Sequence, residues 1–367
     1  MKLITISLVA ALAMASFVVL SSDDASAASS SPYEITDGTG QVFRYDRPSD
    51  HVVVAGFAAA LTLVDLGLAS KIVGTDTYGA YDYYKNAKLE VLKDRPSIGS
   101  IGTAGNNSNV VATLAQWVEE GRMSLDDTVI FTTYITNGKV LRGLLEERGF
   151  THVLIWGTIS EYGDIADMVD TLSMAMTGKK STVAEDMRAV QREVASKVAG
   201  IGEKSKALFV WWTASSPSDV KVGSGGSLAV SLIMAAGGEN AGYNPQASGT
   251  YGDKNTMLQI LEANPGALLL LDSSYVRAHG VEQFRQDFLG GKADIRILAL
   301  EQTWNNYCPE SADGLWAIAQ ALYPDVFGGM DKPRSEAPGE NPLTYAVAGA
   351  VVAIIVAGGA VWFLRRP

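Results

Sequence analysis

The sequence is poor in the side chains that usually bind metals or form covalent cross-links. Among its 367 residues it has one cysteine, Cys308, and three histidines, His51, His152 and His279. A single cysteine cannot form a disulfide within the chain, and the histidines lie far apart with no partner at the spacing of a zinc site. We therefore expect the histidines to be structural, and we expect no metal site and no cofactor.

Positive charge is also scarce. The chain has 29 Lys and Arg against 40 Asp and Glu, which gives a net charge of -11 and a pI of about 4.8. Such a chain repels nucleic-acid phosphates and anionic lipid surfaces. We therefore expect no nucleic-acid partner. The hydrophobic content of 47% is high enough for a large folded core.

The sequence lacks the motifs of the common catalytic sites. It has no G-x-S-x-G elbow, no Walker loop and no G-x-G-x-x-G fingerprint, because the nearest stretch, which begins at Gly223, has Leu228 in place of the last glycine. A turn before a helix capped by Ser227 explains this stretch better than a phosphate site does. The pair Asp126-Asp127 starts a predicted strand, where carboxylates are usually solvated. We predict no catalytic residues and no enzyme, although a fold by itself never excludes catalysis.

Two apolar runs lie outside the expected folded region. Residues 1–27 combine Lys2, an uncharged run over 3–20 and the small residues Ala25-Ser26-Ala27, which is the pattern of a secretory signal peptide. An uncleaved membrane anchor is the alternative, because the apolar run is long.

The second apolar run, YAVAGAVVAIIVAGGAVWFL at 345–364, carries no charge and would span about 30 Å as a helix. Arg365 and Arg366 follow it, and positive residues stay on the cytoplasmic side of a membrane. We predict a transmembrane helix at 343–364 and, before it, a proline-rich, charged stalk at 329–342 that is extended rather than packed. The folded part would then lie at the cell surface, anchored in the cytoplasmic membrane.

Between these segments, short apolar runs alternate with amphipathic segments, which predicts an α/β fold of parallel strands joined by helices. The predicted domains are an N-terminal α/β lobe at 33–180, an interlobe helix at 181–202 and a C-terminal α/β lobe at 203–328. A capping box of Thr182 and Glu185 starts the helix, and Gly200 and Gly202 end it. Its apolar residues recur at helical spacing. They are Val183, Met187, Val190, Val194 and Val198.

The predicted strands end repeatedly in aromatic side chains. The stretch DTYGAYDYYKN at 76–86 follows the second strand and contains four tyrosines. Open α/β sheets bind ligands beyond the carboxyl ends of their strands, and loops lie at the surface. For each ring taken singly, core packing is the alternative. The aromatic residues at these strand ends are Tyr78, Tyr81, Tyr83, Tyr84, Tyr134, Trp156, Trp211, Trp212, Tyr275, Trp304 and Tyr307.

From about His51 to Tyr323 the chain resembles the substrate-binding proteins of ABC importers, in the class that serves ferric siderophores, haem and cobalamin. The resemblance depends on HVVVAGFAAALTLVDLGLASKIVGTD, on the helix at 181–202, and on the later stretches GSGGSLAVSLIMAAGGENA, LQILEANPGALLLLD and SADGLWAIAQALYP. It implies two Rossmann-like lobes bridged by a single long α-helix. It also implies a ligand held between the lobes, limited opening, and delivery of that ligand to a membrane permease.

By position, the resemblance places a small-molecule ligand between ten residues of the two lobes. They are Phe57, Tyr78, Tyr81 and Tyr134 in the first lobe, and Trp212, Tyr275, Arg277, Trp304, Asn305 and Tyr307 in the second. The tyrosines at 76–86 would form an aromatic rim against which a large flat ligand or metal chelate stacks. The loops supply mainly Arg277 as a positive charge, which favours a less charged ligand such as a corrinoid over an anionic catecholate siderophore. Direct iron binding by tyrosines is the alternative.

Two departures from the family concern the permease. The family commonly docks through one glutamate on each lobe. This chain has Lys85 and Asn86 at the first position and Leu258 at the second, with Glu262 one turn later. A surface sensor or scavenger of the same fold, without a transport partner, is therefore the alternative function.

Overall fold

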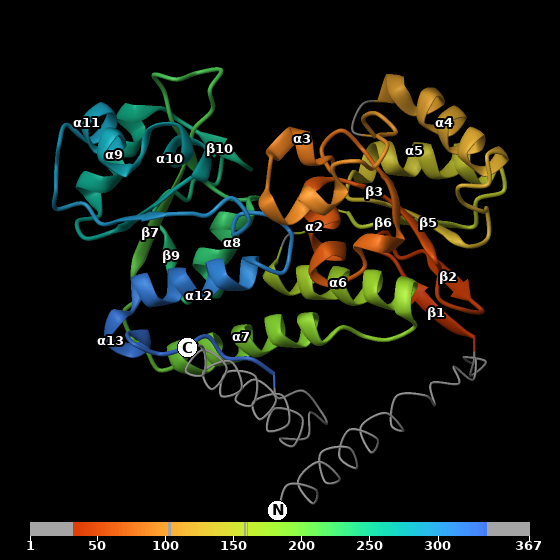
Figure 1. Cartoon of the computed structure of the whole chain (residues 1–367). Coiled ribbons are helices and arrows are strands. Elements are labelled where there is room, and N and C mark those ends of the chain that lie inside the picture. The colour runs from red at the N-terminus through yellow and green to blue at the C-terminus, as the bar shows by residue number, and fades with distance from the viewer. Residues whose placement is uncertain (1–31, 102–103, 158, 160, 336–367) are drawn as a thin grey trace, which may run out of the picture.

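The computed structural model describes residues 32–101, 104–157, 159 and 161–335 (Figure 1). The predicted signal peptide at 1–27 and the predicted transmembrane helix at 343–364 lie outside these ranges. Within them, no helix is both long enough and apolar enough to cross a membrane. The described chain is a mixed α/β fold with two larger sheets and a two-stranded hairpin. We call the part from β1 to α6 the N-lobe and the part from β7 to α13 the C-lobe.

The N-lobe is built on a parallel four-stranded sheet in the order β4-β3-β5-β6. Strand β3, in the interior of this sheet, is apolar on both faces. On one face, Val52 and Val54 belong to a hydrophobic cluster with helices α2 and α6. On the other face, Val53 and Ala55 belong to a second cluster with α4 and α5. The elements are β3 His51–Ala55, α2 Phe57–Asp65, β4 Ile72–Thr75, α3 Tyr81–Tyr84, α4 Asn107–Glu119, β5 Thr128–Thr132, α5 Ile135–Glu146, β6 His152–Ile155 and α6 Tyr162–Thr177, with short 3-10 turns at Ala69–Lys71, Ala87–Leu92 and Ala104–Asn106.

The C-lobe is built on a mixed sheet in the order β10-β8-β7-β11-β12, with β9 also paired to β7. Strands β7, β11 and β12 are parallel, whereas β8 and β10 run antiparallel to their neighbours. In β7, Leu208 and Val210 face helices α9, α10 and α11, and Phe209 faces α8 and α12. The elements are β7 Lys206–Trp211, β8 Lys221–Gly223, α8 Leu228–Ala235, β9 Glu239–Asn240, β10 Thr250–Tyr251, α9 Lys254–Ala263, β11 Leu268–Leu271, α10 Ser273–His279, α11 Val281–Leu289, β12 Ile297–Ala299, α12 Ser311–Leu322 and α13 Pro324–Phe327.

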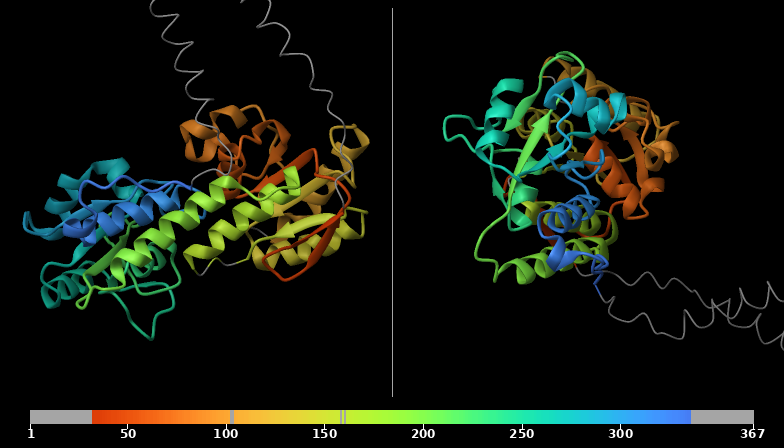
Figure 2. Two further views of the ribbon diagram at one scale, coloured as in Figure 1. Left: turned by 90° about the horizontal axis from the view of Figure 1, so that it is seen from below. Right: turned by 90° about the vertical axis from the view of Figure 1, so that its left-hand side faces the viewer.

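Helix α7, Thr182–Val198, connects the lobes. It packs against α6 of the N-lobe and against α12 and α8 of the C-lobe, and it runs along the side of the molecule opposite α3 and α10 (Figures 1 and 2). Met187, Val190 and Val194 are buried, which confirms the predicted apolar stripe. A single long helix thus supports both sheets from one side.

The start of α7 differs from the prediction. Ser181 is the N-cap, and its Oγ accepts hydrogen bonds from the backbone N–H groups of Val183 and Ala184, at 3.0 and 3.4 Å. The capping box of Thr182 and Glu185 is therefore wrong by one residue, because the hydroxyl of Ser181 already satisfies the free N–H groups of the first turn.

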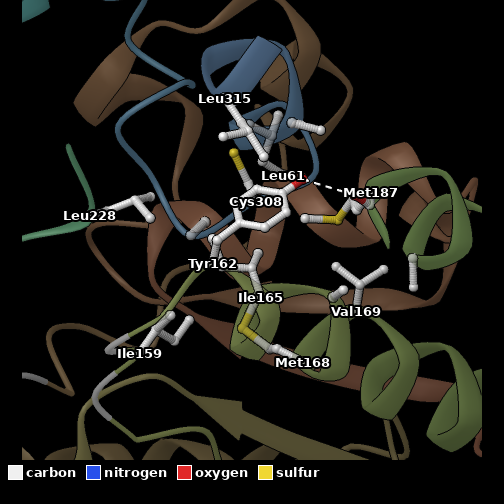
Figure 3. Close-up of a cluster of buried hydrophobic side chains, with 14 of the residues drawn as sticks. Leu61, Ile159, Tyr162, Ile165, Met168, Val169, Met187, Leu228, Cys308 and Leu315 are labelled. Carbon is white, nitrogen blue, oxygen red and sulfur yellow. Dashed lines mark hydrogen bonds between the residues drawn. The ribbon is translucent and has the colours of Figure 1, made fainter. Parts of the chain in front are cut away.

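The two lobes also share one hydrophobic cluster. Tyr162 of α6 lies in it with Leu61 of the N-lobe and with Leu228 and Leu315 of the C-lobe (Figure 3). Its hydroxyl donates a hydrogen bond to the carbonyl oxygen of Met187 in α7, at 3.3 Å. Separating the lobes would expose this core as well as bend the helix, so we expect only limited opening.

A β-hairpin that the sequence analysis did not predict precedes the N-lobe sheet. It consists of β1, Tyr33–Thr36, and β2, Val42–Tyr45. Its turn inserts Asp37 into the lobe, where the carboxylate pairs with Arg142 and accepts a hydrogen bond of 2.9 Å from the N–H of Ile155. The buried ion pair attaches the hairpin to α5, and the hydrogen bond attaches it to the end of β6.

The first part of the predicted stalk packs against the fold. Residues 329–335 form no helix or strand. Lys332 nevertheless forms an ion pair with Asp313 of α12, and the N–H of Ser335 donates to Asp186 of α7 at 2.6 Å. The expectation of an unpacked segment from residue 329 onward is therefore wrong for these residues, because side chains of α7 and α12 supply hydrogen-bond partners for them.

Candidate ligand-binding surface

Four tyrosines gather at the carboxyl edge of the N-lobe sheet, and we call them the phenol cluster: Tyr78, Tyr83, Tyr84 and Tyr134. The ring of Tyr78 lies edge-on to that of Tyr83 at 4.9 Å and is tilted against that of Tyr134 at 6.3 Å. The rings of Tyr83 and Tyr84 are 4.7 Å apart. Tyr83 is 54% exposed and the other three are half-buried. The cluster is therefore a surface feature with accessible aromatic faces.

Two further predicted site residues pack between this cluster and the hydrophobic core. Phe57 is buried, and its ring lies 4.4 Å from that of Tyr84. Tyr81 is half-buried and packs with Tyr84 against the large hydrophobic cluster. The short helix α3 thus turns Tyr81 toward the core and leaves Tyr83 toward solvent.

Asp76 lies under the phenol cluster, and the sequence analysis gave it no role. It follows β4 directly and has no exposed surface. Its Oδ1 accepts hydrogen bonds from the N–H groups of Gly56 and Gly79, at 2.9 and 2.7 Å. The carboxylate therefore connects the turn after β3 to the tyrosine-bearing loop after β4. An aspartate placed between a strand end and a glycine-containing loop was the signal that could have identified it.

The phenols of the cluster influence one another. Burial raises the pKa of Tyr134 and of Tyr84 above the ordinary value for tyrosine, and the neighbouring phenols and Asp76 raise both further. The positive charge of Arg277 in the C-lobe opposes these effects and lowers the pKa of Tyr84. The positive charge of Arg277 therefore reaches the cluster from the other lobe. At neutral pH, Tyr84 and Tyr134 are therefore uncharged phenols that can donate a hydrogen bond.

The C-lobe carries a pocket of about 300 Å³ at the ends of its strands. Two predicted site residues, Asn305 and Tyr307, line it. Trp211 lines it as well and is 38% exposed. None of the phenol-cluster residues is among its lining residues, so the pocket and the cluster are separate features of the two lobes. The rest of the lining is Phe209, Gly226, Ser227, Leu228 and Thr250.

Two predicted site residues pack inside the C-lobe instead. Trp212 is buried, and its indole N–H donates to the carbonyl oxygen of Pro217 at 3.1 Å. Tyr275 is buried against Phe284 and Phe288, and its hydroxyl donates to Asp287 at 2.5 Å. Because their aromatic faces are covered and their polar atoms are paired, we leave Trp212 and Tyr275 out of the proposed binding surface.

The remaining two predicted residues lie at the margin of that surface. Arg277 is exposed on α10. Trp304 is half-buried against α12, where Gly314 leaves room for it: a Cβ atom at Gly314 would lie only 2.8 Å from that of Trp304. Trp304 therefore packs at the base of the loop that carries Asn305 and Tyr307.

An ion cluster of Asp65, Lys88 and Glu310 connects the lobes. Lys88 Nζ lies 2.7 Å from Asp65 Oδ1 within the N-lobe and also forms an ion pair with Glu310 of the C-lobe. Burial raises the pKa of Asp65 to about 6, with Glu310 adding to the rise and Lys88 opposing it. Lys88 lowers the pKa of Glu310 despite its burial, so in mildly acidic solution Asp65 is the carboxylate that takes up a proton.

Asp65→Asn is expected to change how stability depends on pH. Because the pKa of Asp65 is raised in the folded state, its contribution to stability is fully present below about pH 4 and is lost as the pH rises through about 6. The variant should remove about 2 kcal/mol of the difference in unfolding free energy between about pH 4 and about pH 7, measured by urea unfolding. Asp325→Asn, at an exposed position, should leave that difference unchanged. Equal pH dependence in Asp65→Asn and the parent would contradict the assignment.

Lys85 ends α3 in a left-handed conformation, with φ 50. It is the one residue other than glycine with positive φ among those the structure describes. We expect Lys85→Gly to stabilise the protein by up to about 1 kcal/mol, because glycine adopts this conformation without the clash of a Cβ atom. Lys93→Gly, at a cap with right-handed geometry, should instead destabilise it. Urea unfolding of both variants tests this, and a loss of stability in Lys85→Gly would contradict it.

The two sheets bridged by α7 give the chain the fold of the TroA-like periplasmic binding proteins. FepB of that class, from Veillonella parvula, superposes with a TM-score of 0.62 at 16% identity, over 82% of this chain and 92% of that one. No protein-family model matches the chain, and no curated protein matches its sequence.

Two more solved structures share this fold. The haem-binding protein RhuT from Roseiflexus sp. RS-1 superposes with a TM-score of 0.55 at 15% identity, over 76% of this chain and 99% of that one. The vitamin B12 binding protein BtuF of Vibrio cholerae gives 0.53 at 16% identity, over 76% and 98%. At these identities the likeness shows the fold, and it confirms the mixed α/β fold expected from the sequence.

Proposed function

We propose that this protein is an extracytoplasmic solute-binding protein that captures an iron complex or a corrinoid between its lobes and delivers it to an ABC importer. The observation that carries the proposal is the phenol cluster at the carboxyl edge of the N-lobe sheet, with the pocket of Asn305, Tyr307 and Trp211 at the ends of the C-lobe strands. Uncharged aromatic faces suit a large flat ligand. Proteins of this fold that bind haem and vitamin B12 support the same class of ligand. We propose no enzymatic activity.

The proposal includes the membrane topology expected from the sequence. Residues 1–27 would direct export, and 343–364 would anchor the protein in the cytoplasmic membrane, with the C-terminal Arg365 and Arg366 inside. The proposed domains remain 33–180, 181–202 and 203–328, followed by a stalk that is held at Lys332 and Ser335 before it reaches the membrane.

The test is to express residues 28–335 and to detect retained ligand by native mass spectrometry. Hemin, cyanocobalamin and ferric siderophores are then titrated while tryptophan fluorescence is followed, because Trp211 and Trp304 lie in or beside the pocket. Saturable quenching by one class identifies the ligand. If no compound of these classes quenches the fluorescence or is retained, the proposed function is wrong.

A sensor or scavenger without a permease is the second candidate. It is favoured by Lys85 at one of the positions where a docking glutamate is expected and by Leu258 at the other, although the nearby Glu262 is exposed. The two functions differ in one measurement. A transport protein stimulates the ATPase activity of its importer in membranes, whereas a sensor binds the ligand and leaves that activity unchanged.

A further inference from the structure

The phenol cluster lies directly over a buried negative charge. Asp76 has no exposed surface, and its Oδ2 accepts no hydrogen bond from any residue that the structure describes. Burial raises its pKa, while the N–H groups of Gly56, Gly79 and Tyr78 oppose the rise by stabilising the carboxylate. No lysine, arginine or histidine of the described chain forms an ion pair with it. The charge of Asp76 therefore acts on its surroundings without a local counter-ion.

The tyrosine rings above Asp76 add to this negative field. The faces of aromatic rings carry partial negative charge and attract cations. Tyr78 contacts the rings of Tyr83 and Tyr134, so three rings lie next to one another at the loop that Asp76 holds through the N–H of Gly79. Burial and, after it, the charge of Asp76 raise the pKa of Tyr134, so Asp76 acts on this phenol.

The opposing charge comes from the C-lobe and acts on a different ring: Arg277 affects the pKa of Tyr84 more than Asp76 does, whereas at Tyr134 burial comes first and Asp76 is the foremost charged group. Arg277 is exposed, so water and salt screen it, whereas Asp76 acts through the interior of the protein, where the effective dielectric constant is lower. The exposed Asp82 and Lys85 beside the cluster carry opposite charges. The phenol cluster is therefore most negative on the side of Tyr134, where Asp76 is the foremost charged group.

We propose that the phenol cluster and Asp76 select a positively charged metal complex, with the cationic face of the ligand against the N-lobe and its acidic groups, where it has them, toward Arg277. This inference rests on the proposed function and specifies the charge of the ligand. It excludes trianionic catecholate complexes of iron as ligands, because their charge would face Asp76.

The test uses ligand pairs that share their chemistry and differ by one charge. Cationic ferrioxamine B is compared with neutral ferrichrome, and cationic aquocobalamin with neutral cyanocobalamin, with ferric enterobactin as the trianion. Affinities for residues 28–335 are measured by tryptophan fluorescence at low and at high salt. In whichever pair binds, we expect the cationic compound to bind about tenfold more tightly than the neutral one. This ratio of affinities should be smaller at high salt.

Asp76→Asn is the decisive variant, because its Oδ1 still accepts from Gly56 and Gly79 while the charge is removed. It should reduce the preference for the cation to near one. Asp82→Asn, at an exposed position on α3, should retain most of that preference. Arg277→Gln should instead increase the preference for the cation, because it removes the opposing positive charge.

The outcomes separate the two proposals. A cation preference that falls in Asp76→Asn and rises in Arg277→Gln supports the inference. Binding of ferric enterobactin as tight as that of ferrioxamine B overturns the inference while leaving solute binding intact, and so does a preference that Asp76→Asn leaves unchanged. Failure of all five compounds and of hemin to bind overturns the proposed function and the inference together. Circular dichroism of each variant establishes that the fold is retained.

Discussion

Tyr78→Ala is expected to weaken ligand binding by about 30-fold. Tyr78 contacts the rings of both Tyr83 and Tyr134, so its removal takes away its own stacking surface and the support of two others. Burying one aromatic side chain against a ligand contributes about 2 kcal/mol, which corresponds to that change in affinity. The measurement is the fluorescence titration of residues 28–335 with whichever of hemin, cyanocobalamin and ferrichrome the parent binds.

Two matched variants determine how Tyr78 acts. Tyr78→Phe keeps the ring and should bind within about threefold of the parent if stacking provides the affinity. Tyr243→Ala removes a tyrosine that is 70% exposed on a C-lobe loop and should have no effect. If Tyr78→Ala binds as tightly as the parent, the phenol cluster is not the ligand site, even if the protein binds one of these ligands elsewhere.

Asp37→Ala is expected to lower the unfolding free energy by about 3–5 kcal/mol, because it leaves the buried guanidinium of Arg142 without its partner. The side chains of Asp37 and Arg142 are 0% and 8% exposed. The variant also removes the acceptor for the N–H of Ile155 in the edge strand of the sheet. Urea unfolding at neutral pH measures the loss.

The double variant Asp37→Ala/Arg142→Met provides the control. It removes both charges, so it should be more stable than Asp37→Ala alone. Burial by itself would raise the pKa of Asp37, but hydrogen bonds from Thr39 and Ile155 and the charge of Arg142 together lower it. The stability that depends on Asp37 is therefore present above about pH 4 and is lost as the pH falls below that value. A double variant as unstable as the single one would contradict this account.

The sequence was informative about the sheets and the bridging helix because their burial is periodic. Buried parallel strands are apolar on both faces, as Val52 and Val53 are in β3, and the stripe of Met187 and Val190 repeats with the period of a helix. The β1–β2 hairpin has no such pattern. Contacts between Asp37 and Arg142, which are far apart along the chain, hold it in place.

The candidate site could be predicted in part, because the tyrosines at 76–86 are adjacent in sequence and follow one strand. The sequence could not show which ring at a strand end faces the interior. Trp211 and Trp212 are neighbours with opposite environments, since only Trp212 packs with Tyr275 inside the C-lobe. Trp211, which lines the pocket, was among the strand-end aromatics but not among the ten site residues.

By itself, the sequence determined the alternation of strands and helices, the helix between the lobes and the aromatic character of the loops after the strands, because each depends on residues close together in the chain. Only the tertiary structure decided that Asp76 lies beneath the phenols, that Arg277 acts on them from the other lobe and that Lys88 joins Asp65 to Glu310. These relations depend on side chains from different elements meeting at one place, and their distances and burial follow from packing of the whole chain.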